Sequence, residues 1–209
     1  MKFILGTKEK MTQIFTDNGK AVVVTAVKAG PMTVIQVKTK DKDGYQAVQV
    51  GFGEKKETNI NKAQKGHYKG LGNFRYVKEF RADDDVAAKE GDTIDASVFA
   101  EGDAVAVSGI SKGKGFQGVV KRHGFHGGPR THGQKHSERE AGSIGGGGRA
   151  GGRVAKGMRM PGRMGGDRIT VRRLKVVGVD KENSLLLISG AVPGRRGTLL
   201  EIRGSKLKV

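Results

Sequence analysis

The sequence predicts a mainly β protein, a small β-barrel that carries a long, basic, glycine-rich finger. Short apolar runs separated by turn signals recur along most of the 209 residues, a spacing typical of a small barrel rather than of alternating β and α units. Residues 121–168 differ from the rest, because 15 of these 48 are Gly, 11 are Lys or Arg and only 9 are apolar. Such a segment buries too little apolar surface to offset the entropy of ordering it. We therefore expect a polyanion to order it.

The first group of expected strands occupies the N-terminal part of the chain. Residues 17–19 (Asp-Asn-Gly) are a strong hairpin signal because Asn-Gly tolerates the positive φ angles of tight turns. Residues 30–31 (Gly-Pro) and 41–44 (Asp-Lys-Asp-Gly) mark two further turns. The period-two pattern and these turns predict strands at 10–15, 20–27, 32–38 and 45–52.

The rest of the chain continues the same pattern around the basic segment. Residues 53–73 are polar with room for a short helix, and residues 83–85 begin an acidic loop. Further strands are expected at 74–80, 93–99, 104–110, 169–179, 185–190 and 198–203.

The strands on the two sides of the basic segment are expected to lie in one barrel. The domains that follow are a barrel formed by residues 1–110 and 169–209, with 53–90 as a peripheral insertion, and a finger at 111–168.

The charge of the chain is concentrated in one region. Its formal net charge is +18, and residues 112–175, with 16 Lys or Arg against 3 Asp or Glu, contribute +13 of it. A localised cationic stretch is typical of nucleic-acid binding. The absence of Cys excludes a disulfide scaffold, a thiolate zinc site and a Cys nucleophile. No run approaches the apolar length of a membrane span, so no membrane partner is expected.

A formal GxGxxG pattern occupies residues 113–118. Dinucleotide binding would need this pattern inside a βαβ unit, and nothing after it suggests one. A flexible basic turn is the plainer interpretation. We favour contacts of its backbone amides, Lys112 and Lys114 with RNA phosphates, which glycine permits by close approach.

Metal binding and catalysis have little support in the finger, which holds four of the five His. His132 and His136 could share one face of a helix, but Gly133 disfavours that helix and no Cys or well-placed carboxylate completes a site. Stacking on bases or bonding to phosphates suits these His better. Glu138 and Glu140 lie in a solvated loop with no catalytic partner. We expect no metal, no cofactor and no enzymatic activity.

Six stretches of the chain resemble a known family, the universal large-subunit ribosomal protein number three in its bacterial form. The similarity runs nearly end to end, and SKGKGFQG and PGRMG are its most specific motifs. The matching stretches are GTKEKMTQIF (6–15), DGYQAVQVGF (43–52), SGISKGKGFQGVVKRHGF (108–125), THGQKHSEREAGSIG (131–145), PGRMGGDRITVRRLKVV (161–177) and NSLLLISGAVPG (183–194).

The resemblance implies a translation-protein β-barrel whose extension threads through the rRNA of the large subunit. It further implies binding near the 3′ end of 23S-class rRNA, a role in starting subunit assembly, and an extension that approaches the peptidyl transferase centre. The implied protein partners are the large-subunit proteins numbered fourteen and nineteen, in the cytoplasm and without homo-oligomers. Many bacterial members carry a methylated Gln near the fingertip. Residues 145–152 contain no Gln, so Arg149 or the backbone must make that contact here.

The RNA-binding residues expected from the sequence are the cations and His of the finger and its base. They are Lys112, Lys114, Lys121, Arg122, His123, His126, Arg130, His132, Lys135, His136, Arg139, Arg149, Arg153, Lys156, Arg159, Arg163, Arg168, Arg172 and Arg173.

Two other functions remain open. A free RNA chaperone or ribosome assembly factor would share the basic finger but would not remain in washed large subunits. An enzyme on a similar barrel, such as a flavin reductase, would need a cofactor pocket.

Overall fold

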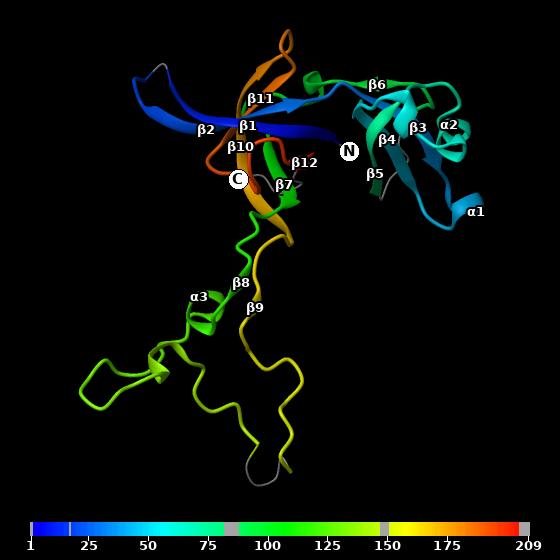
Figure 1. Ribbon diagram of the computed structural model, residues 1–209. Coiled ribbons are helices and arrows are strands. Elements are labelled where there is room, and N and C mark those ends of the chain that lie inside the picture. Colours follow the sequence, from blue (N-terminus) through cyan, green and yellow to red (C-terminus); the bar gives the residue numbers. More distant parts are fainter. Residues whose placement is uncertain (1, 17, 82–87, 147–150, 205–209) are drawn as a thin grey trace. The chain divides into compact units, whose positions relative to one another are not determined.

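The computed structural model describes residues 2–16, 18–81, 88–146 and 151–204 (Figure 1). The chain divides into two compact units. The first contains residues 1–110 and 168–209, and the second contains residues 111–167.

A closed, antiparallel six-stranded barrel forms the centre of the first unit, which confirms the prediction of a mainly β protein with a β-barrel. Closure leaves no strand edge unpaired in the barrel. In their order around the barrel the strands are β1 (Phe3–Phe15), β12 (Leu199–Gly204), β7 (Ala104–Ile110), β10 (Arg168–Asp180), β11 (Leu185–Ser189) and β2 (Ala21–Ala29).

Aliphatic side chains fill the barrel interior, as the low aromatic content requires. Ile4, Leu200 and Ile202 have no exposed surface, and each such burial contributes roughly 1.5–3 kcal/mol. Glycine is needed where strands approach most closely. A Cβ added at Gly109 would lie 2.8 Å from Leu200 Cδ2, so a side chain there would push β7 away from β12.

β7 and β10, the strands on the two sides of the basic segment, lie in one barrel as expected, and they pair directly. Their register begins with Ile110 opposite Arg168 and continues with Gly109 opposite Ile169. Both ends of the second unit therefore start from one strand pair of the barrel.

A second, four-stranded sheet adjoins the barrel within the first unit. Its order is β5 (Phe74–Arg81), β4 (Ala47–Glu54), β3 (Met32–Lys38) and β6 (Thr93–Ile94). The sequence analysis assigned the strands at 32–38 and 45–52 to the barrel, whereas the structure places β3 and β4 in this separate sheet. The alternation of apolar residues identifies a strand but not its partner, because pairing is non-local.

Short helices connect the strands of this sheet. α1 (Lys40–Asp43) occupies the expected turn after β3, and η1 (Glu57–Asn59) and α2 (Lys62–Tyr68) occupy the polar stretch after β4. α2 begins where the Asn61 side chain accepts a hydrogen bond from Gln64 N at 2.8 Å. Residues 93–99 were expected as one strand. They give only β6 before η2 (Ala96–Val98), a 3-10 turn that begins after Asp95 and in which Val98 N donates to Asp95 O at 3.3 Å.

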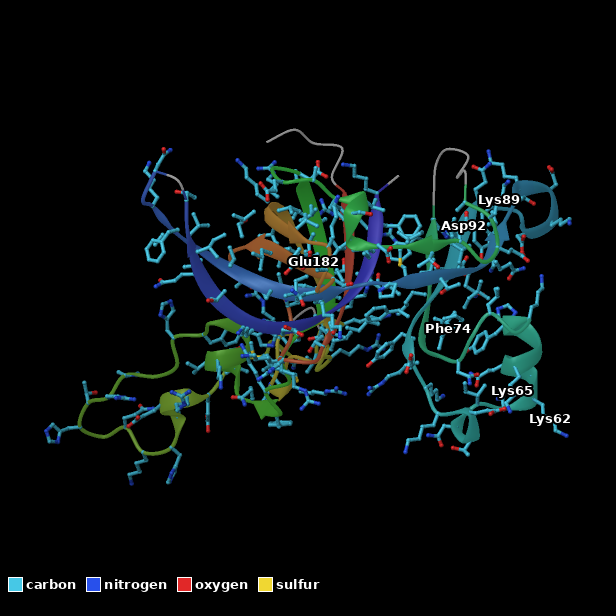
Figure 2. The ribbon with its side chains drawn as sticks, turned by 90° about the horizontal axis from the view of Figure 1, so that it is seen from above. Lys62, Lys65, Phe74, Lys89, Asp92 and Glu182 are labelled. Carbon is cyan, nitrogen blue, oxygen red and sulfur yellow. The ribbon has the colours of Figure 1, made fainter. Side chains whose placement is uncertain are left out.

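Aromatic contacts hold the sheet against the barrel and against α2. Phe3 of β1 stacks on Phe80 of β5 with ring centroids 4.4 Å apart. On the side of β5 that faces α2, Phe74 meets Tyr68 edge-on at 5.5 Å (Figure 2). Gly51 leaves room for this ring, since a Cβ there would lie 2.3 Å from Phe74 Cγ. The first unit thus has one continuous core with a small satellite cluster under α2.

β1 starts at Phe3, seven residues before the strand that the sequence predicted at 10–15. Residues 8–10 are charged, yet β1 continues through them. The pairing of β1 with β2 shifts register between Lys8 and Met11, and the Lys8 ammonium donates to Val192 O at 2.8 Å and to Gly194 O at 3.0 Å. The acidic loop expected at 83–85 lies outside the described residues.

The second unit has little regular structure. Besides a two-residue strand pair, β8 (Phe116–Gln117) and β9 (Gly162–Arg163), it contains α3 (Val119–His123) and η3 (Ser137–Arg139). The glycine-rich composition explains this, because glycine loses the most backbone entropy in regular elements. The sequence analysis expected none of these short elements.

Candidate nucleic-acid interface

Residues 111–117 and 162–167 run antiparallel at the start and end of the second unit, and we call this pair the neck (Figure 1). The amide of Ser111 donates to Asp167 O at 2.8 Å, and Lys114 and Met164 are joined by the bond from Lys114 N to Met164 O at 2.9 Å. Met164 N donates in turn to Gly115 O at 2.9 Å. The neck therefore holds Lys112, Lys114 and Arg163 on an ordered backbone.

Gly165 makes this close pairing possible. Its φ is +74°, and a Cβ at this position would lie 2.2 Å from Lys112 O. Any other residue would be strained by its own backbone angle and would also strike the opposite segment. The SKGKG and PGRMGG stretches of the sequence thus pair with each other to form the neck.

α3 follows the neck and has three basic residues in its last turn, Lys121, Arg122 and His123. Arg122 Nη1 donates to Met160 O at 2.7 Å, and His123 Nε2 donates to the same carbonyl at 3.0 Å. Both side chains are half-buried, whereas Lys121 is exposed. Arg122 and His123, predicted from the sequence to bind RNA, are therefore engaged in fastening α3 to the returning chain.

The segment after α3 folds back on itself. Gly128 N donates to Glu138 O at 3.0 Å, and Arg130 Nε forms an ion pair with the Glu138 carboxylate at 3.3 Å. The three remaining His of this unit, His126, His132 and His136, are exposed. Within the described residues no three His, Cys, Asp or Glu side chains gather closely enough to hold a metal ion.

Most of the predicted RNA-binding residues have exposed side chains in the second unit. Arg149 lies outside the described residues. The exposed residues are Lys112, Lys114, Lys121, His126, Arg130, His132, Lys135, His136, Arg139, Arg153, Lys156, Arg159 and Arg163.

The other three predicted residues, Arg168, Arg172 and Arg173, belong to β10 in the barrel. Arg168 forms an ion pair with Glu201 of β12. Arg172 and Arg173 form a bulge where the register with β7 shifts, and Arg173 has a φ of +59°. In a regular strand one of two successive side chains would point into the barrel. The bulge instead exposes both arginines.

Phe116 is a residue that the sequence analysis missed. It lies on β8 opposite Arg163, and its side chain is 75% exposed. An exposed aromatic ring between cations is suited to stacking on an unpaired base. A local signal was available, because Phe116 is the one large apolar residue between Ser111 and Gly118.

A second cationic group, around Tyr45 in the first unit, also went unpredicted. Lys38 Nζ donates to Tyr45 Oη at 2.7 Å, and the Arg81 guanidinium lies 4.8 Å from the centroid of the Tyr45 ring. The hydrogen bond to Tyr45 is the main cause that raises the pKa of Lys38, and Glu79, 3.3 Å away, adds to it. Lys38 is therefore firmly protonated at neutral pH.

The surface beside Tyr45 is a shallow cavity of about 480 Å³, which we call the Tyr45 basin. It brings together Lys78 and Arg81 of β5, Arg168 of β10 and Arg203 of β12, against two carboxylates. These residues are far apart in the sequence and have no common motif. Only the tertiary pairing of strands assembles them.

A basic, glycine-rich unit attached to a β-barrel is suited to a nucleic-acid-binding protein. The family model of ribosomal protein L3 matches residues 71–185. The large ribosomal subunit protein uL3 of Desulfitobacterium hafniense (strain Y51) is 53% identical over 206 residues, which cover 98% of this chain and 96% of that protein. The proteins of the same name from Mycolicibacterium vanbaalenii (52% identical, 98% and 95% covered) and Finegoldia magna (49%, 97% of each) are also similar.

This chain belongs to the ribosomal protein L3 family. Membership makes it a structural protein of translation and not an enzyme, as the sequence analysis expected. None of the helices in the described part of the chain has the length and apolar content needed to cross a membrane.

Proposed function

We propose that this protein is a structural constituent of the large ribosomal subunit that binds 23S-class rRNA. The observation that supports this most directly is the second unit, which exposes cations along a glycine-rich backbone fixed at the neck. Residues 111–167 contain 12 Lys or Arg against 3 Asp or Glu. Phosphate contacts of this kind give affinity and release counterions from the RNA.

We propose that the second unit is the finger predicted from the sequence and that it enters folded rRNA. Its 18 glycines support this, because a backbone without Cβ atoms can approach phosphates and bases closely. The resemblance to the family adds binding near the 3′ end of the rRNA, an early role in assembly, and a tip directed toward the peptidyl transferase centre. The Tyr45 basin is a candidate for a second RNA contact, made by the first unit.

Contacts with other ribosomal proteins need a different kind of surface. The hairpin of β1 and β2 presents Met11 (48% exposed), Phe15 (69%) and Val23 (54%), and the strand register places Met11, Phe15 and Val23 on one face. This apolar face is our candidate for docking a neighbouring protein. The family resemblance implies that the neighbours are the large-subunit proteins numbered fourteen and nineteen.

Two measurements together test the proposal. The full chain should bind large-subunit rRNA with an affinity that falls steeply with salt. In cells that make it, the protein should be present in large subunits after a high-salt wash, in equal amount with the other subunit proteins. A protein that binds RNA but is lost in the wash would instead be a free RNA chaperone or assembly factor.

A further inference from the structure

The second unit contains a cavity of about 710 Å³ between the end of α3, the loop that follows and the returning chain. Its walls come from residues 123–129, from 134–142 and from Arg159. The volume is in the range of small-molecule sites, which are roughly 300–1,000 Å³. The walls contain aromatic, cationic and carboxylate groups together, a combination that RNA phosphates alone would not require.

Phe125 and Arg159 form one end of this cavity. The Arg159 guanidinium carbon lies 6.0 Å from the centroid of the Phe125 ring, at the outer limit of a cation–π contact. Stacked bases are about 3.4 Å apart, so a base between the two groups needs roughly 6.8 Å. A shift of under about 1 Å by the exposed Arg159 would admit a base plane between ring and guanidinium.

The polar wall contains Gln134, Ser137 and Glu140. Among the described residues, Glu138 is paired with Arg130, while no ion pair holds Glu140. A carboxylate in this wall repels a phosphate and accepts hydrogen bonds only. Among the four RNA bases, guanine alone presents two adjacent N–H groups on its Watson–Crick edge, N1–H and N2–H, which match the two oxygens of a carboxylate.

The loop that shapes the cavity is fixed by glycine. Gly127 has a φ of +77°, and a Cβ on it would lie 2.0 Å from Glu138 O. At Gly128 a Cβ would lie 2.8 Å from Gln134 Nε2. The lack of a Cβ at both glycines lets residues 127–128 lie against 134–138, where Gly128 N donates to Glu138 O at 3.0 Å, so the cavity is part of the folded unit.

We propose that this cavity holds one unstacked guanine of the RNA, with its plane between Phe125 and Arg159 and its Watson–Crick edge on Glu140. The inference rests on the proposed function, because it assigns one base to an interface that otherwise binds phosphates. Gln134 and Ser137 add further hydrogen-bonding groups to the polar wall of the cavity. Through such a contact the protein would recognise one base of the RNA specifically, within an interface that otherwise binds phosphates electrostatically.

The test uses the full chain and short fluorescent oligouridylates that carry one central guanosine, adenosine or cytidine, with binding measured by anisotropy at low salt. The guanosine probe should bind roughly 10-fold more tightly than the adenosine probe, as for one good bidentate base contact. Glu140→Gln should abolish this preference without lowering affinity for plain oligouridylate. Phe125→Leu should weaken the guanosine probe by roughly 10-fold through loss of stacking.

Glu182→Gln is the matched control, because it removes the same charge from an exposed residue in the turn between β10 and β11 (Figure 2). It should leave the guanosine preference unchanged. Equal binding of all probes by the wild type, or a preference that survives in Glu140→Gln, overturns the guanine site and leaves RNA binding intact. If no probe binds and large-subunit rRNA does not bind either, the proposed function fails together with this inference.

Discussion

Gly165 shows how a single residue permits the close pairing of the two segments of the neck. It combines a positive φ with a position against Lys112 O where a Cβ does not fit. Gly157 has a similar φ of +85°, but a Cβ there would meet no atom within 4 Å. Substitutions at these two glycines therefore distinguish the effect of backbone strain from the effect of a steric clash.

Gly165→Ala should open the neck, whereas Gly157→Ala should not. Both substitutions bear the cost of a positive φ, roughly 1 kcal/mol, and only the first adds the clash with Lys112 O. Hydrogen exchange of the Lys114 and Met164 amides measures the opening. Fast exchange of these amides in Gly157→Ala as well would show that the neck is held by something other than the close approach at Gly165.

Asp103 illustrates how a single carboxylate stabilises a turn of the barrel. Its Oδ2 accepts from Ala100 N at 3.0 Å and from Lys2 Nζ at 2.6 Å. These two hydrogen bonds, that of Ala100 first, lower the pKa of Asp103. Because the folded pKa is below the unfolded value, the stabilisation is complete above the unfolded value, about 3.9, and is lost as the pH falls through the folded pKa.

Asp103→Asn should lower the melting temperature at neutral pH. The difference from the wild type should begin to shrink once the pH falls below about 4, where the carboxyl of the unfolded chain takes up a proton, and should vanish only below the lowered pKa of the folded protein. Thermal unfolding followed by circular dichroism over a pH series measures this. A difference that stays constant from neutral to acidic pH would mean that the charge of Asp103 is not the source of the stabilisation.

The bulge of β10 is a strand irregularity that exposes two arginines. Arg173 adopts the left-handed conformation that is uncommon for a side-chain-bearing residue, and Arg172 precedes it with an exposed side chain. A strained backbone that presents two cations next to the second unit's attachment strand is consistent with selection for charge rather than for stability.

Arg173→Gly should therefore separate stability from RNA binding. Removing the side chain relieves the positive φ, so the barrel should keep or gain stability, by up to about 1 kcal/mol. The loss of one cation should at the same time flatten the salt dependence of rRNA binding, by about 0.9 in log–log slope. Arg172→Ala is the comparison, with the same loss of charge and no relief of strain. A large destabilisation by Arg173→Gly would show that the bulge depends on the arginine itself.

Local signals in the sequence predicted the barrel strands and the location of the positive charge, but not their tertiary arrangement. The strand patterns on the two sides of the basic segment led us to expect β7 and β10 in one barrel, but not their direct pairing. In contrast, the separate sheet and the Tyr45 basin depend on contacts between distant residues. The hydrogen bond of Arg122 to Met160 O was not predicted for a related reason: composition cannot distinguish a cation bound to a backbone carbonyl from one that faces solvent.

At the level of the whole molecule, the apolar core lies in the first unit, whereas the net positive charge is densest in the second, where residues 111–167 hold 12 Lys or Arg against 3 Asp or Glu. The first unit contains a continuous apolar core, while the second contributes Val119 to the buried residues and 12 of the 39 cations. A unit of this composition gains little from its own packing. We expect its cations and glycines to act by binding a polyanion. Because such binding weakens with salt, the salt concentration is the variable with which to test it.

The most direct test is the salt dependence of binding between the full chain and large-subunit rRNA, measured by filter binding. A variant with Lys112, Lys114, Lys121 and Arg163 changed to Ala removes exposed cations of the neck and α3. Its matched control changes Lys40, Lys42, Lys56 and Lys62 to Ala, which are exposed cations of the first unit in or next to α1, η1 and α2; Lys62 is labelled in Figure 2. The neck variant should flatten the log–log slope by up to about 3.6, at about 0.9 per lost phosphate contact, while the control keeps the wild-type slope. Equal slopes for the two variants would contradict the assignment of the rRNA interface to the second unit.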